Sequence, residues 1–304
     1  MSAFAALADW GTSSFRLWLV DGEGAVLGER RSSEGMTTAG EAEGGFAGVL
    51  ERQLDALGVA GDLPVVACGM VGARQGWVEA TYIDTPADPE SLADGAVRVT
   101  DTGRAVFILP GVCQRAEGAF DVMRGEETQI LGLEAGEGRR LACLPGTHSK
   151  WVVLEEDRLT GFSTFMTGDL YAAIAGHTIL KHSVKPQDES FDVAVFQAAV
   201  RAAFARPAEL SNRLFSIRAA GLLAQEEAQH PATTLSGLLI GLELAGAASR
   251  FGRLDETSVR LVAAGPLASR YRAAFDALDI AAHEEDGEAA VRRGLLAAAR
   301  KILR

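Results

Sequence analysis

A short motif occurs twice in this chain, and its spacing constrains the fold more than any other feature. Gly-Thr-x-Ser stands at residues 11–14 and again at 146–149, so that each residue of the second copy lies 135 positions after its counterpart. In both copies an apolar segment leads in, another leads out, and an acidic turn follows. The spacing predicts an internal structural duplication, in which two related lobes each present a glycine hairpin.

Both turns have the composition of a phosphate-binding loop. Residues 15–20 alternate between two faces, as a strand does, and the turn before them is small and polar. Because Gly11 has no Cβ, the backbone can turn sharply there and direct successive N–H groups at an anion. The predicted phosphate contacts are Gly11, Thr12 and Ser13 in the first turn and Gly146, Thr147 and His148 in the second.

Length and charge restrict the class of protein. The 304 residues suffice for two domains, each with its own core. A formal charge of −12 argues against a nucleic-acid or anionic-membrane partner. The three cysteines have no Cys-x-x-Cys spacing, so we expect neither a disulfide framework nor a zinc site. The apolar stretch at 235–248 contains Glu243 and is too short to span a membrane. We therefore expect a cytoplasmic protein.

The order of elements predicts a ribonuclease H-like lobe. Three strands ending near residue 31 are followed by a helix at 46–57 and a buried strand at 64–68. Ligands bind at the carboxyl ends of such strands, so residues 69–77 are candidate site residues. We expect a loop-rich excursion at 79–103. Further predicted elements are a helix start after Arg124, helices at 191–204, 210–227, 235–248, 267–278 and from 288, and strands at 259–264 and 280–282.

These motifs together resemble a known family. The chain contains Asp-Trp-Gly-Thr at 9–12, Cys-Gly-Met-Val-Gly at 68–72, Met-Arg-Gly-Glu-Glu-Thr-Gln at 123–129, Leu-Pro-Gly-Thr-His-Ser-Lys-Trp at 144–151, Met-Thr-Gly-Asp-Leu at 166–170 and Ala-Ala-Gly at 263–265. The set resembles the 2-dehydro-3-deoxygalactonokinase family of the actin-like ATPase superfamily over nearly the whole chain.

The resemblance implies an α/β protein of two ribonuclease H-like lobes, in the actin-like ATPase (sugar kinase) fold, with an interdomain nucleotide cleft. Residues 1–138 would carry the first phosphate hairpin and the sugar-acid site, and residues 139–304 the second hairpin and an adenosine site at Gly265. The implied reaction is ATP-dependent phosphorylation of the 6-hydroxyl of 2-dehydro-3-deoxy-D-galactonate in galactonate catabolism.

Phosphoryl transfer needs a metal and a base, and the chain offers carboxylates for both. Asp9, beside the first turn, is the candidate Mg²⁺ ligand, the alternative being a carboxylate that only caps the turn. The superfamily's aspartate base corresponds to a glutamate here. We predict that Glu126 is the general base and that Glu127, about 100° away around the helix, supports it. The alternative is that both glutamates only complement the helix dipole.

A sugar acid also needs a cationic partner. Arg74 and Arg124 are the arginines nearest the predicted cleft motifs, and a guanidinium binds a carboxylate with two parallel hydrogen bonds. Met70 and Gly72 belong to the same motif, and Trp77 would form a wall. Either arginine could instead form a surface ion pair, and the tryptophan could be a packed ring.

Two alternatives to this function remain open from the sequence. One is a kinase for another sugar or sugar acid, and the other is an actin-like module that uses ATP as a switch. The expected partners are ATP and a small sugar acid, with no nucleic acid and no membrane. The oligomeric state is not readable from the sequence.

Overall fold

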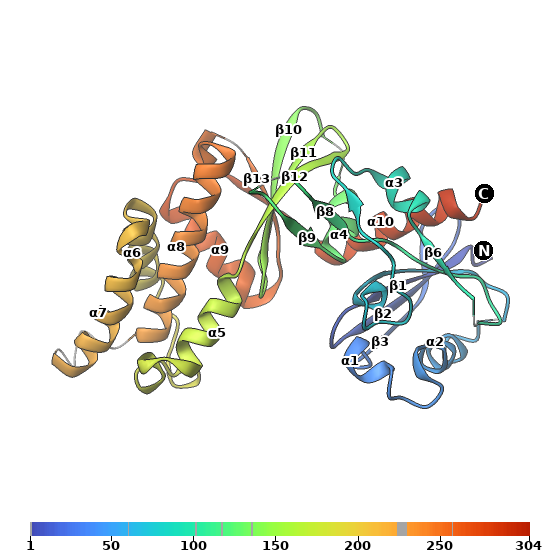
Figure 1. Cartoon of the computed structure of the whole chain (residues 1–304), viewed down its shortest axis with the longest axis horizontal. Helices are drawn as coiled ribbons and strands as arrows, with labels where there is room; N and C mark the ends of the chain where they lie inside the picture. Colours follow the sequence, from blue (N-terminus) through green and yellow to red (C-terminus); the bar gives the residue numbers. More distant parts are fainter. Residues whose placement is uncertain are drawn as a thin grey trace. The chain divides into compact units, whose positions relative to one another are not determined.

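The structure is a computed structural model that describes residues 2–304 except 60, 101, 117, 135, 224–229 and 257. Its contacts divide the chain into two compact units. Unit 1 consists of Met1–Gly138, Leu154–Gly161 and Asp286–Arg304, and unit 2 of Arg139–Val153 and Phe162–Glu285. Figure 1 shows the elements of both units.

Unit 1 is built on a six-stranded sheet with the order β3-β2-β1-β4-β7-β6. Its strands are β1 (Ala5–Trp10), β2 (Phe15–Val20), β3 (Val26–Ser32), β4 (Val65–Gly69), β6 (Val97–Val99) and β7 (Val106–Ile108). The first three form an antiparallel meander, β4 and β7 run parallel to β1, and β6 closes the edge antiparallel to β7. The largely exposed β3 carries charged residues, as suits an edge that must not pair with other chains.

Unit 2 repeats this plan in a sheet with the order β12-β11-β10-β13-β14. The strands of this sheet are β10 (Arg139–Leu144), β11 (Ser149–Glu155), β12 (Arg158–Phe165), β13 (Val259–Val262) and β14 (Ala282–Glu285). The segment Leu154–Gly161, at the end of β11 and the start of β12, belongs to unit 1. Both β10–β13 and β13–β14 are parallel pairs. Each sheet therefore has three consecutive strands followed by two parallel strands that return over helices. This order confirms the predicted duplication and the ribonuclease H-like, actin-like ATPase fold.

Helices α2 (Gly45–Asp55) and α10 (Gly287–Ile302) cover the two faces of the sheet in unit 1. The other helices of this unit are α1 (Met36–Ala39), α3 (Pro89–Asp94) and α4 (Glu126–Leu131), with a 3₁₀ turn η1 (Met70–Gly72). Successive side chains of β1 pack into different hydrophobic clusters, because side chains of a strand alternate between the two faces of the sheet. Ala6 and Ala8 pack in the cluster that contains Leu50 of α2, whereas Leu7 packs in the cluster that contains Leu295 of α10.

The C-terminal helix α10 belongs to unit 1 because it crosses α4 at two glycines. A Cβ on Gly132 would lie 1.9 Å from the Ala290 carbonyl oxygen, and one on Gly294 would lie 2.0 Å from the Thr128 carbonyl oxygen. Only glycine permits such a close crossing. The sequence analysis instead assigned residues 139–304, which include α10, to the second lobe. The lobe boundaries stay a prediction.

The helices of unit 2 lie between its strands in the sequence. They are α5 (Thr167–His177), α6 (Val193–Ala205), α7 (Leu210–Leu223), α8 (Pro231–Phe251) and α9 (Gly265–Ala277), with 3₁₀ turns η2 (Ile179–His182), η3 (Pro186–Asp188), η4 (Pro207–Glu209) and η5 (Leu254–Glu256). In Figure 1, α6, α7 and α8 lie side by side. Positions 224–227 of the helix predicted at 210–227 lie outside the described residues.

Helix α8 is long and apolar enough to cross a membrane by length and composition. Two thirds of its most apolar window is buried in the structure, however, and it packs along α6. Gly237 and Gly241 permit this contact, since a Cβ at either would lie within 2.6 Å of a carbonyl oxygen of α6. The helix is thus a core element of unit 2. It is longer than the stretch at 235–248 that the sequence predicted, so burial and not length accounts for its apolar composition.

Residues 79–103 contain much irregular chain, as expected, but also short regular elements that the sequence analysis did not predict. This stretch contains α3, the edge strand β6 and the short strand β5 (Ile83–Asp84), which forms a second, three-stranded sheet with β8 (Val112–Gln114) and β9 (Asp121–Met123). A reciprocal capping box between Asp88 and Ser91, with proline at the next position, starts α3. The last strand, predicted at 280–282, is observed at Ala282–Glu285 because Ala282 pairs with Val259.

Candidate active site

The first glycine turn is held against the start of α1. The Gly11 N–H donates to the Ser14 carbonyl at 2.9 Å and closes the turn, while the Thr12 carbonyl accepts the Thr37 N–H at 3.1 Å. Gly35, just before the helix, approaches so closely that a Cβ would lie 2.5 Å from the Ser13 backbone. The predicted residues Gly11, Thr12 and Ser13 therefore form one fixed turn.

Asp9 is the half-buried residue of β1, separated from the turn by the buried Trp10, and it is in register with Cys68 of β4. The Arg16 guanidinium lies 3.2 Å from its carboxylate. Burial raises the pKa of Asp9 above its ordinary value, Arg16 opposes this, and the charges of Glu288 and Glu126 raise it further. A cation bound among these carboxylates would relieve their repulsion.

Two glycines bring the Arg-Gly-Glu-Glu motif to the end of β4. Gly69 has φ +93°, and a Cβ on it would lie 2.7 Å from the Trp10 carbonyl oxygen. Gly125 has φ +102°, and its Cβ would lie 3.3 Å from the Gly69 Cα. Positive φ and close backbone contact both require glycine. The start of α4 consequently packs next to the strands that carry Asp9.

The two glutamates at this helix start differ in exposure and in hydrogen bonding. Glu127 is 1% exposed, and its carboxylate accepts the Gly125 N–H at 2.6 Å and the Thr128 hydroxyl at 2.9 Å. Burial, followed by the charge of Glu126, raises its pKa to about 7. Glu126 is half-buried, and its carboxylate accepts the Arg124 N–H at 3.2 Å. Of the two glutamates, only Glu126 is partly exposed.

Of the two predicted arginines, Arg124 has the more enclosed guanidinium. It lies over the Tyr82 ring at 4.4 Å and donates to the Ala80 carbonyl at 2.7 Å. Its Nε and Nη1 are buried and have no hydrogen-bond partner among the described residues. Gly72 makes room for it, since a Cβ there would lie 3.0 Å from Nη1.

The other sugar-acid candidates are placed differently. The Arg74 side chain is 82% exposed and lies 3.6 Å from the Glu79 carboxylate, as in an ordinary surface ion pair. Trp77 packs among aromatic rings, stacked on Phe46 with 6.1 Å between centroids and edge-on to Trp10. It is a partly buried core ring. Met70 is half-buried at the start of η1, where its carbonyl accepts a backbone N–H.

In unit 2 the second glycine turn repeats the contacts of the first. The Thr147 carbonyl, the counterpart of Thr12, accepts the N–H groups of Gly168 and Asp169 at the start of α5, both at 3.1 Å. A Cβ on Gly168 would lie 2.7 Å from the Thr147 Cα. The exposed His148 ring lies 2.7 Å from the Asp169 carboxylate through Nε2. The duplication therefore extends from strand order to individual hydrogen bonds.

Gly265 begins α9 with φ +60° and is followed by proline. A Cβ at this position would meet no atom within 4 Å, so backbone conformation and not space demands glycine. The surface over this turn is open to a ligand.

Glu288, which no sequence motif singled out, lies in the first turn of α10, and its charge raises the pKa of Asp9. Its acidic position at a helix start was the only local signal, and that pattern is common. Among the described residues no group of three or more His, Cys, Asp or Glu side chains forms a metal cage. A Mg²⁺ ion that keeps several waters and binds phosphate needs no such cage.

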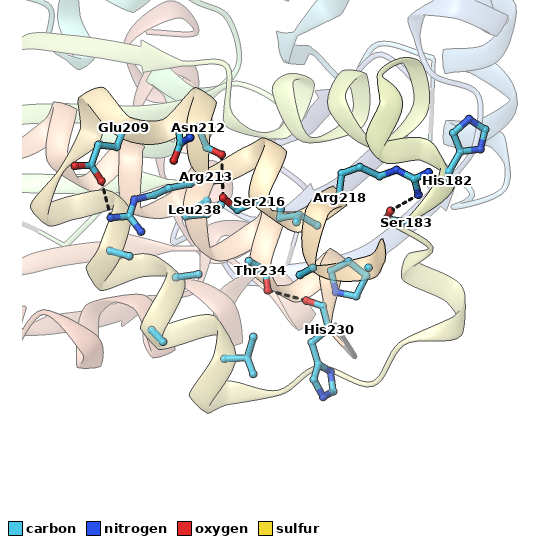
Figure 2. A pocket seen from close by; sticks show the side chains of 18 residues that line it. His182, Ser183, Glu209, Asn212, Arg213, Ser216, Arg218, His230, Thr234 and Leu238 are labelled. Carbon is cyan, nitrogen blue, oxygen red and sulfur yellow. Dashed lines mark hydrogen bonds and ion pairs between the residues drawn. The ribbon is translucent and has the colours of Figure 1, made fainter. Parts of the chain in front are cut away.

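A cavity of about 980 Å³ lies apart from these residues, between η2, α6, α7 and α8 of unit 2 (Figure 2). Its charged side chains are partly engaged already: Arg213 pairs with Glu209 at 2.8 Å, and Arg218 reaches the Ser183 hydroxyl at 3.5 Å. The described lining includes none of the predicted site residues. We assign this cavity no chemistry.

Glycine turns that follow the first strand of each ribonuclease H-like sheet are the arrangement of the actin-like ATPase class. The chain belongs to the 2-keto-3-deoxy-galactonokinase family, whose model matches residues 9–298. The predicted family is thereby confirmed, and with it a kinase activity that uses ATP.

Two named relatives and one crystal structure match almost the entire chain. A Rhizobium meliloti (strain 1021) protein, named as a probable 2-dehydro-3-deoxygalactonokinase, DgoK1, is 50% identical over 99% of this chain and 98% of its own. The Escherichia coli (strain K12) 2-dehydro-3-deoxygalactonokinase is 33% identical over 99% of both chains. A crystal structure from Sinorhizobium meliloti, provisionally given the same enzyme name, has 49% identity and a TM-score of 0.93, covering 98% of this chain and 99% of that one.

Proposed function

We propose that this kinase transfers the γ-phosphoryl group of ATP to the 6-hydroxyl of 2-dehydro-3-deoxy-D-galactonate, giving 2-dehydro-3-deoxy-6-phosphogalactonate. The observation that carries the proposal is the placement of the Glu126 helix start beside the end of β1. There the charge of Glu126 acts on Asp9. This placement supports Glu126 as the base and Asp9 as the metal ligand, although the two motifs are far apart in the sequence.

Glu126 is the general base in this proposal. A primary hydroxyl is a weak nucleophile at neutral pH, and a carboxylate within hydrogen-bond reach takes its proton as the phosphoryl group arrives. The partial exposure of Glu126 supports this role. Glu127 is too enclosed to reach a substrate, and its bonds to Gly125 and Thr128 hold the helix start in place.

Asp9 is the proposed Mg²⁺ ligand, directly or through water. When bound, the ion neutralises charge on the transferring phosphate. The fit rests on two further carboxylates near Asp9: burial raises the pKa of its carboxyl above the ordinary value, and the charges of Glu288 and Glu126 add to that shift. The N–H groups of the two glycine turns would bind phosphate oxygens, and Gly265 would face the adenosine; the residues assigned to these contacts are Gly11, Thr12, Ser13, Gly146, Thr147 and His148.

Arg124 is the proposed partner of the sugar-acid carboxylate. A buried guanidinium with two unpartnered N–H groups is costly, and an anion beside it would remove that cost. The Tyr82 ring and the Ala80 carbonyl orient the group. Arg74 is too exposed for such a role, and Met70, Gly72 and Trp77 shape the surroundings.

The test is a coupled ADP-release assay with a panel of acceptors. The panel contains 2-dehydro-3-deoxy-D-galactonate, its gluconate epimer, neutral hexoses and a no-acceptor control. Preferred turnover of the galactonate compound supports the proposal. Preference for another sugar or acid transfers the same mechanism to that acceptor, and ADP release without any acceptor indicates an ATP-driven switch instead. We also propose a cytoplasmic location and no nucleic-acid or membrane partner.

A further inference from the structure

A glutamate on α8 is buried among donors from three other elements of unit 2. Glu243 is 2% exposed and stands in an otherwise apolar stretch. Its Oε1 accepts the Trp151 indole N–H of β11 at 2.8 Å, and its Oε2 accepts the Tyr271 hydroxyl of α9 at 2.6 Å. The Thr167 hydroxyl, at the start of α5, also donates to Oε2.

These donors stand on both sides of the second glycine turn. On one side, the Tyr271 hydroxyl also bonds the Ser149 hydroxyl at 3.0 Å, and Ser149 accepts the Gly146 N–H at 3.5 Å. On the other side, Thr167 precedes the two N–H groups that bind the Thr147 carbonyl. One carboxylate therefore fixes both flanks of the turn formed by Gly146 and Thr147.

The same carboxylate also holds the helix that begins at Gly265. Tyr271 is one of the buried residues of α9, so its bond to Glu243 sets the position of α9 relative to β11. The phosphate turn and the adenosine turn of unit 2 thus share a single buried anchor.

Stability alone does not account for such an anchor. A buried carboxylate costs free energy, and well-packed apolar residues of similar volume commonly stabilise a fold at least as well. What a carboxylate adds is direction, because several donors are aimed at two oxygens at once. Burial raises the pKa of Glu243, and its donors act against that shift.

We propose that Glu243 is a positioning residue for the nucleotide. It acts through Tyr271, Ser149 and Thr167 to keep the Gly146–Thr147 turn and the start of α9 in the geometry that binds ATP. This inference rests on the proposed function for its assignment of the two turns.

The test compares three variants by calorimetric titration with ADP in the presence of MgCl₂. Tyr271→Phe removes one hydroxyl from the network, and Glu243→Leu removes the anchor. Glu243→Gln is the conservative variant: its amide oxygen accepts the Trp151 N–H, and its NH₂ group donates to the two hydroxyls, which reverse their roles. Tyr171→Phe, a tyrosine change elsewhere in unit 2, is the control.

We expect Tyr271→Phe to weaken ADP binding about tenfold, as for loss of a hydrogen bond to a charged group, and Glu243→Leu to weaken it more. Glu243→Gln and Tyr171→Phe should bind within about threefold of the parent, since neither breaks the network. In steady-state kinetics the KM for ATP should rise while the KM for the sugar acid stays unchanged, because the change is confined to the nucleotide turns.

Parent-like ADP binding by folded Tyr271→Phe and Glu243→Leu overturns the inference, as does an equal rise in both KM values. If Glu243→Leu does not fold, the ADP affinity of Tyr271→Phe alone tests the inference. A parent protein that binds ADP but phosphorylates no acceptor refutes the proposed function, while the titrations still judge Glu243. A parent that binds no nucleotide refutes both.

Discussion

The buried carboxyl of Glu127 makes a quantitative prediction about stability against pH. Its pKa is raised from an ordinary 4.5 to about 7, with burial as the largest cause. The folded protein therefore binds this proton more tightly than the unfolded chain does. Stability from the protonated carboxyl is complete below pH 4.5 and is lost as the pH rises through about 7.

The size of this effect follows from the shift in pKa. At about 1.4 kcal/mol per unit of pKa shift, the contribution of this carboxyl to the free energy of unfolding is about 3 kcal/mol smaller at pH 8 than at pH 4.5. For a unit of this size that corresponds to roughly 6–12 °C in Tm, at about 2–4 °C per kcal/mol. Glu127→Gln removes the titration but keeps an acceptor for the Gly125 N–H and a partner for the Thr128 hydroxyl.

The assay is thermal unfolding of the parent and Glu127→Gln from pH 4.5 to pH 8. Burial also raises the pKa of Asp9 and of Glu243, so both proteins lose stability with rising pH, and the difference between them isolates Glu127. We expect the Tm of Glu127→Gln to rise relative to the Tm of the parent as the pH increases. Glu126→Gln is the matched control, and it should keep most of the parent's slope because burial of Glu127 is unchanged. Parallel curves for the parent and Glu127→Gln would refute the reasoning.

Three further predictions concern catalysis. Glu126→Gln should lower kcat by about 10²–10⁴-fold with both substrates still binding, and a loss under tenfold in stopped-flow turnover would contradict a general base. Asp9→Asn should impair turnover more than thermal stability and should be most impaired at limiting Mg²⁺; full activity there excludes the metal role. Arg124→Ala should raise the sugar-acid KM with the ATP KM spared, whereas Arg74→Ala should match the parent. Unchanged preference for acids in Arg124→Ala places the carboxylate contact elsewhere.

Local sequence patterns determined the framework of this protein. The 135-residue repeat predicted two sheets of one topology, because a glycine turn between apolar strands specifies a hairpin by itself. The acidic pair after Gly125 predicted the start of α4, since acidic side chains favour a helix N-terminus. Each glycine turn and the start of α4 are specified by neighbouring residues, and the structure confirms these elements.

Only the tertiary structure decided which distant side chains share a site. Glu288 acts on Asp9 because α10 crosses α4 at Gly132 and Gly294, a contact that no local pattern encodes. Burial likewise distinguishes the two candidate arginines. The Arg124 guanidinium has buried nitrogens, whereas Arg74 is exposed, and the sequence does not reveal this difference.

The role proposed for Glu243 also depends on packing. In the sequence it is a single acidic residue in an apolar stretch, where it argues only against a membrane-spanning helix. In the fold, Trp151, Thr167 and Tyr271 converge on it from three elements. A carboxylate acquires such a function only from the donors that surround it, and those donors are brought together by chain folding over more than 100 residues of sequence.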